Sequence, residues 1–147
     1  MRLHPSVPMP LERYVPAPGL ALPDGSHVPP GAAVGISPYV AGRNAACFGG
    51  DADAFRPERW LRAAGESEAA YGDRVRAART VADLAFGGGS RVCIGRHLAL
   101  MELYKMVATL VNRFEIELVD PAREWDVVGR WFFRQKGIIC RLRRRGA

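Results

Sequence analysis

The strongest constraint on the fold is a glycine-rich segment over residues 86–95, which reads FGGGSRVCIG. Its four glycines allow the backbone to turn tightly and to come close to a bound group. A helical pattern begins at about Arg96, so the segment is expected to form a loop that leads into a helix. The thiol of Cys93 would then face the unpaired N–H groups and positive end of that helix, which favour its thiolate form.

A single thiolate presented in this way suits one metal bond, and haem iron accepts one axial thiolate from protein. Arg91, two residues before the cysteine, adds a cation that can pair with a carboxylate. Two other interpretations stay open. Cys93 can be a buried structural cysteine beside a glycine turn, or the loop can cradle a phosphate. The second is disfavoured because no Gly-Lys-Ser/Thr follows the glycines.

The spacing Phe-x-x-Gly-x-Arg-x-Cys-x-Gly closely resembles the haem-binding signature of the cytochrome P-450 family, the haem-thiolate monooxygenases. The signature positions are occupied by Phe86, Gly89, Arg91, Cys93 and Gly95. The resemblance implies haem b (iron protoporphyrin IX) as cofactor, with these five residues around it and the Cys93 thiolate as its axial iron ligand. It assigns no catalytic residue to this chain.

A second motif lies upstream, where residues 55–60 read FRPERW and resemble the Phe-x-Pro-Glu-Arg-Phe/Trp motif of the same family. The family couples this arginine, here Arg59, to the Glu and Arg of a Glu-x-x-Arg motif in a buried ion-paired network. Arg2 resembles the arginine of that motif, but its glutamate is not in this sequence, which is expected to begin inside the motif. Losing one partner of a buried ion pair costs roughly 3–5 kcal/mol. Without that glutamate, the two positive charges of Arg2 and Arg59 are expected to repel each other unless a carboxylate such as Glu58 compensates.

The resemblance also implies contacts for residues outside the two motifs. Arg13 resembles a basic residue that meets a haem propionate, and three apolar residues near it resemble the lining of the substrate pocket. Residues 131–133 resemble a loop that touches substrate. Each has a simpler alternative. Arg13 can lie on the solvent-exposed face of a strand, the three apolar residues can belong to a half-buried strand, and residues 131–133 can be aromatic residues of a core. The three pocket candidates are Val7, Met9 and Leu11.

Eight prolines within residues 1–36 predict extended structure, with strands over 11–15, 27–28 and 33–36 and a hairpin turn at Asp24-Gly25. Further elements are expected along the rest of the chain. These are a helix over 37–50 with Ser37 as its N-cap, a broken helix or mobile loop over 61–85, a helix from Arg96 to about Arg113, a strand over 115–119, and paired strands or a hairpin over 131–134 and 137–142. Residues Ala99, Leu103, Met106, Leu110 and Phe114 form a helical stripe that is expected to pack in a core.

Composition limits the class of protein. The chain has 147 residues, a net charge of +6, and three cysteines too far apart for a disulfide framework or a zinc ribbon, so a reducing, intracellular location is expected. No apolar run approaches the roughly 20 residues that span a bilayer, and no membrane anchor is expected in this chain. The arginines over 141–145 predict a solvated terminus. Because no aromatic residues alternate with them, nucleic acid is not an expected partner.

Together these features predict an α+β fold: the C-terminal portion of the mainly helical haem-thiolate monooxygenase fold, with small β hairpins, the cysteine-ligand loop and a long helix after it. Residues 1–147 are expected to form a single partial domain. The resemblance implies a parent enzyme, at the endoplasmic reticulum membrane, that inserts one oxygen atom from O2 into a small organic substrate with electrons from a reductase. This chain alone is expected to be incomplete. A non-catalytic haem-binding fragment and a basic interaction fragment are the alternatives.

Overall fold

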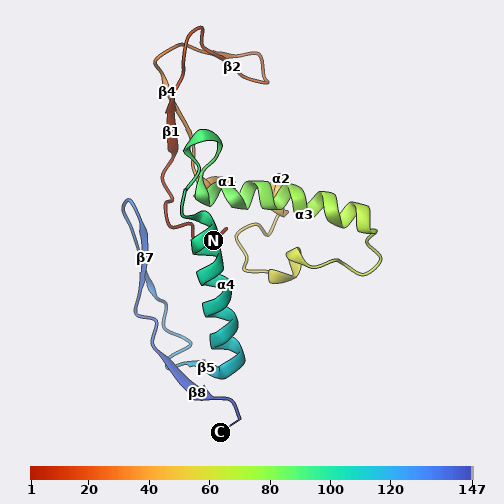
Figure 1. The fold of residues 1–147 in the computed structure, drawn as a ribbon, viewed down its shortest axis with the longest axis vertical. Coiled ribbons are helices and arrows are strands. Elements are labelled where there is room, and N and C mark those ends of the chain that lie inside the picture. The colour runs from red at the N-terminus through yellow and green to blue at the C-terminus, as the bar shows by residue number, and fades with distance from the viewer. Residues whose placement is uncertain (147) are drawn as a thin grey trace. The chain divides into compact units, whose positions relative to one another are not determined.

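The computed structural model describes residues 1–146 and divides into two compact units, Met1–Gly87 (unit 1) and Gly88–Ala147 (unit 2) (Figure 1). Each unit combines helices with two-stranded antiparallel sheets. This arrangement agrees with the α+β prediction. The prediction that residues 1–147 belong to a single domain stays a prediction.

Unit 1 begins with extended, proline-rich chain, as the sequence predicts. The turn at Asp24-Gly25 closes a hairpin: the Ser26 N–H donates to Asp24 Oδ1 over 3.0 Å, and Gly25 has a φ of 84°. The outer pair of strands has Leu11 opposite Ile36 and Tyr14 opposite Ala33. The four strands are β1 (Leu11–Tyr14), which pairs with β4 (Ala33–Ile36), and β2 (Leu20–Ala21), which pairs with β3 (His27–Val28).

The single helix predicted over 37–50 is two short helices, α1 (Pro38–Ala41) and α2 (Ala45–Phe48). Ser37 caps α1 as predicted, since its side chain accepts from the Val40 N–H. The break comes at Gly42, which ends α1, and at Asn44, whose Oδ1 accepts from Ala46 N–H over 2.9 Å and begins α2. A second capping side chain therefore restarts the helix where the sequence suggested continuity.

The prediction of a broken helix or mobile loop over 61–85 is wrong for residues 68–82, which form one continuous helix. After the 3-10 turn η1 (Pro57–Trp60), a continuous helix of 15 residues, α3 (Glu68–Ala82), runs directly into a second 3-10 turn, η2 (Asp83–Phe86). Ser67 caps α3 by accepting from the Ala70 N–H over 3.2 Å. The helix is held by burial of two of its side chains in the small core of unit 1. The core residues are Phe48, Ala52, Val75 and Ala78, and Trp60 packs edge-on against Phe48.

Arg2 and Arg59 both donate to backbone carbonyls of the segment over residues 42–54, and they share the carbonyl of Ala54. The carboxylate nearest Arg59 is Asp51, whose Oδ2 lies 3.6 Å from Arg59 Nη2, so the expected compensation by Glu58 is wrong. Burial, followed by the charge of Arg59, lowers the pKa of Arg2. The remaining acceptors are Gly42 and Ala52 for Arg2, and Phe48 and Asp51 for Arg59.

Arg74 of α3 forms a two-pronged ion pair with Glu66. Its Nε lies 2.7 Å from Oε1 and its Nη2 lies 2.8 Å from Oε2. The bonds from Arg74, together with one from the Ala63 N–H, lower the pKa of Glu66 from its usual 4.5 to about 2. The Glu66 side chain is 15% exposed, so this pair is more sheltered than the other ion pairs of α3.

Unit 2 contains the predicted long helix, α4 (Arg96–Arg113), and the predicted strand after it, β5 (Phe114–Leu118). The prediction that residues 131–134 and 137–142 pair with each other is wrong, because each belongs to a strand with an earlier partner. These pairs are β6 (Asp126–Gly129) with β7 (Phe133–Lys136), and β5 with β8 (Cys140–Arg144). In the second pair Glu115 lies opposite Arg143 and forms an ion pair with it.

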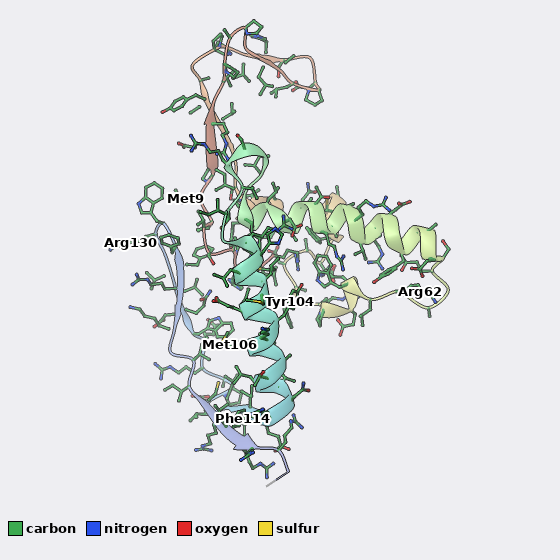
Figure 2. All side chains as sticks on the ribbon, viewed as in Figure 1. Met9, Arg62, Tyr104, Met106, Phe114 and Arg130 are labelled. Atoms are coloured by element: carbon green, nitrogen blue, oxygen red, sulfur yellow. The ribbon has the colours of Figure 1, made fainter. Side chains whose placement is uncertain are left out.

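No side chain in the described part of unit 2, residues 88–146, is buried. Tyr104 and Met106 project from α4 in Figure 2, and Met106 is 55% exposed. The prediction that the apolar stripe of α4 packs in a core is therefore wrong for the described residues. Burial of this stripe depends on a surface that unit 2 does not supply.

The Glu66–Arg74 pair makes the stability of unit 1 sensitive to acid. The folded state holds the carboxylate at a pKa of about 2, below its usual 4.5. The contribution is therefore complete above about pH 5 and is lost as the pH falls towards 2. We expect Glu66→Gln to lower the free energy of unfolding by a constant amount at neutral pH, and this difference should shrink between pH 4.5 and 2. Urea unfolding at several pH values across this range measures the difference in the free energy of unfolding.

Glu68→Gln, at an 80% exposed ion-paired position, is the control and should have a smaller effect at neutral pH.

Candidate functional site

Two glycines of the glycine-rich loop have a positive φ, a backbone conformation that other residues rarely adopt. Gly87 has a φ of 76° and Gly89 has a φ of 61°. Gly89 begins a short 3-10 turn, η3 (Gly89–Arg91), and its carbonyl accepts from the Val92 N–H over 3.3 Å. Gly88 is extended, and a side chain there would meet open space. Positive φ, and not crowding, therefore explains the glycine at position 89.

Cys93 lies three residues before the start of α4 and carries a free, exposed thiol. Its carbonyl accepts from the Arg96 N–H over 3.2 Å, which ties the residue to the first turn. The residue that caps α4 is Gly95, which has no side chain to satisfy the helix N–H groups. A Cβ at Gly95 would lie 3.9 Å from Cys93 Sγ, so the sulfur lies beside the uncapped, positive end of α4. Exposure of Cys93 disagrees with the interpretation as a buried structural cysteine.

A thiol in this position offers one ligand to a metal. The described residues contain no group of three or more His, Cys, Asp and Glu side chains placed to hold an ion. A haem would need only one thiolate from the protein, so the single sulfur of Cys93 would be sufficient to hold it. A Cβ at Gly88 or Gly89, five and four residues before Cys93, would meet no other atom within 4 Å.

The other predicted site residues are divided between the two units. Gly89 and Arg91 lie with Cys93 and Gly95 in one segment of unit 2. Phe86 is the last residue of η2 in unit 1. Arg13 lies on β1, also in unit 1, where it is exposed and donates to the carbonyl of its neighbour Glu12 over 2.7 Å. Four of the six predicted residues therefore share one local segment.

Asp51 is a residue that motif analysis missed. Its carboxylate pairs with Arg56 and lies near Arg59, so it links two positions of the FRPERW motif to the segment before it. The bond from Arg56 is the main cause that lowers the pKa of Asp51. An acidic residue five and eight positions before basic ones was the signal available in the sequence, but this spacing does not predict an ion pair outside a helix.

Comparison with known proteins identifies the family. A sequence model described as Cytochrome P450 matches residues 1–138. The chain belongs to the cytochrome P450 family. The family expected from the two motifs is thereby confirmed, over nearly the whole length of the chain.

Several curated relatives of this P450 chain are fungal. Cytochrome P450 monooxygenase cfoH of Aspergillus candidus is 54% identical over 145 residues, which are 99% of this chain and 27% of the relative. Cytochrome P450 monooxygenase pkfB of Emericella nidulans is 42% identical, over 99% of this chain and 26% of the relative. The P450 chain therefore spans about a quarter of the length of these relatives.

A solved structure supports the fold. The crystal structure of a cytochrome P450, CYP102L1, matches 98% of this chain and 29% of its own with a TM-score of 0.72 and 24% identity. At this identity the likeness concerns the fold alone. The α+β fold predicted for a portion of the P450 domain is confirmed.

The positive φ of Gly89 gives a test of the loop. Gly89→Ala forces a side chain into the left-handed region and is expected to cost about 1–2 kcal/mol in the free energy of unfolding. Gly88→Ala is the matched control, because its extended backbone and open surroundings accept a methyl group without strain. Urea unfolding of the two variants should show a loss for Gly89→Ala alone. Equal stability of the two would contradict the loop conformation.

Proposed function

We propose that this P450 chain binds haem b through the thiolate of Cys93 and forms the proximal haem-binding part of a monooxygenase. The observation that carries the proposal is the exposed Cys93 thiol beside the uncapped start of α4, within the haem-binding signature. Membership of the P450 family supports the same cofactor. The proposed contacts on the haem are Phe86, Gly89, Arg91, Gly95 and Arg13, with Cys93 as the iron ligand.

Bound haem supplies oxygen activation, which no amino-acid side chain can perform. The residues of this chain have supporting tasks. With haem bound, Cys93 would hold the iron through its sulfur and would supply electron density to it, and the positive end of α4 lies beside this sulfur. Gly89 permits the tight turn within the loop. Arg91 and Arg13 are cations and would pair with the two propionate carboxylates of the haem.

The reaction proposed for the whole protein is insertion of one O2-derived oxygen atom into a small organic substrate, with electrons from a reductase. The names of the fungal relatives, which are monooxygenases, support this activity. Because the chain spans about a quarter of those relatives, we propose that residues 1–147 are part of a single larger domain. An intracellular location at the endoplasmic reticulum membrane is proposed for the parent enzyme. Among residues 1–146, no helix has the length and apolar character needed to cross a membrane.

A basic interaction fragment is the alternative function, and the sheet of unit 2 disfavours it. Glu115 and Glu117 of β5 lie opposite Arg143 and Arg141 of β8. Glu115 forms an ion pair with Arg143, so part of the C-terminal positive charge is already neutralised. Cross-strand charge pairs of this kind stabilise a sheet, which gives these arginines a structural role.

The proposal is tested by the difference spectrum of the reduced chain with carbon monoxide after haem is added. A thiolate ligand shifts the Soret band strongly to the red, so we expect this band in the unchanged chain and its complete loss in Cys93→Ala. Cys140→Ala is the matched control, since Cys140 is also free and exposed, and it should keep the band. A band that survives in Cys93→Ala would overturn the assignment of the ligand.

A further inference from the structure

We propose that Arg145 caps the C-terminal end of α4 from the residue after β8, and so makes α4, β5 and β8 one cooperative unit that opens together. The inference concerns unit 2 alone and goes beyond the proposed function, since it does not require haem. Neither sequence motif contains Arg145, and the sequence predicted only a solvated terminus for the arginines over 141–145. The contacts of Arg145 give it a more specific role.

The C-terminal end of α4 has carbonyl groups that the helix itself cannot satisfy. The helix ends at Arg113, and the chain continues directly into β5. The residue at the end of the helix is Phe114, in an extended conformation, and not the glycine that commonly ends a helix. The last carbonyls of α4 therefore need water or a distant part of the chain as their partner.

Arg145 supplies that partner. Its Nε donates to the carbonyls of Val111 and Phe114, over 3.2 Å in each case. Its backbone N–H donates to the Arg113 carbonyl over 2.8 Å. The two side-chain bonds reach residues that lie 34 and 31 positions earlier in the sequence. The guanidinium group also brings a positive charge to the negative end of the helix dipole, which stabilises the last turn.

The register of the β5–β8 sheet places Arg145 at the end of α4. The ladder runs as far as Phe114 opposite Arg144, so Arg145 is the next residue beyond it. Glu115 of β5 pairs with Arg143, and its Oε1 lies 3.9 Å from Arg145 Nη1. Alternate residues of a strand point to the same face, so Arg143 and Arg145 both lie on the side of Glu115. The side chain of Arg145 is thus held by the sheet and bound to the helix.

The chain between β5 and β8 forms a separate pair of strands, β6 with β7. Among the described residues, the side chain of Arg145 makes no hydrogen bond or ion pair with that pair. Loss of the Arg145 contacts should therefore loosen α4, β5 and β8 and leave the β6–β7 pair as it is. This difference separates a cap on α4 from a general effect on unit 2.

Arg144 is the matched control. It directly precedes Arg145, carries the same charge, and makes no side-chain hydrogen bond or ion pair within residues 1–146. Arg144→Met removes one positive charge from the same end of β8 and keeps the bonds of Arg145 to α4. Arg145→Lys keeps the charge near the end of the helix but loses the geometry of the guanidinium group.

The measurement is amide hydrogen exchange of the full chain without haem, followed over residues 110–118, 126–136 and 140–145. In Arg145→Met we expect exchange on the order of tenfold faster over 110–118 and 140–145, with no change over 126–136. Arg144→Met should exchange as the unchanged chain does in all three segments. Arg145→Lys should lie between the unchanged chain and Arg145→Met, and it decides the question if Arg145→Met does not fold.

Unchanged exchange over 110–118 in Arg145→Met would overturn the proposal, as would an equal effect of Arg144→Met. Equal acceleration over 126–136 would also overturn it, because Arg145 would then stabilise unit 2 as a whole. An unchanged chain without protection over 110–118 would contradict the bonds at the end of α4. The carbon monoxide spectrum does not enter this test, so failure of the proposed function and failure of the cap are separate results.

Discussion

The backbone carbonyls of residues 48–54 hold the guanidinium groups that organise unit 1. Arg59 binds three of them, and Arg2 shares the carbonyl of Ala54 with it. Two like charges on one carbonyl repel, and this repulsion adds to burial in lowering the pKa of Arg2. The Nε of Arg59 is buried and has no hydrogen-bond partner among the described residues. The backbone carbonyls of this segment therefore leave one donor of the Arg59 guanidinium unsatisfied in the described part of the chain.

Elements with local signals were predicted well from the sequence. The long helix α4 was expected at its observed bounds, since a regular apolar stripe follows a glycine turn. Ser37 before Pro38 identified the start of α1, and Asp24-Gly25 identified the hairpin turn before β3, although its partner β2 was not predicted. In each case the residues that decide the backbone conformation are adjacent in the sequence. The same holds for the cysteine loop, where residue type and spacing predicted the family that the comparisons confirmed.

Elements that depend on distant contacts were predicted poorly. The helix α3 has few large apolar residues and a glycine at position 72, so its periodicity is weak. It is held by burial of Val75 and Ala78 and by the bonds of Arg74, none of which a local pattern reveals. The prediction for the apolar stripe of α4 was wrong for the opposite reason. Its periodicity predicts burial, but within the described part of unit 2 there is no surface to cover it. Periodicity reports which face of a helix is apolar, and only the rest of the fold determines what that face contacts.

The candidate site is determined by local sequence signals, and the chain that leads to it is determined by distant contacts. The chemistry of Cys93 is local, because the positive φ of Gly89, the uncapped start of α4 and the thiol all lie within a few residues. The chain before the loop depends on distant contacts, because α3 and η2 are held within unit 1 by contacts with η1 and α1. The segment between the two motifs, which has no motif of its own, therefore forms a helix that only its contacts within unit 1 explain.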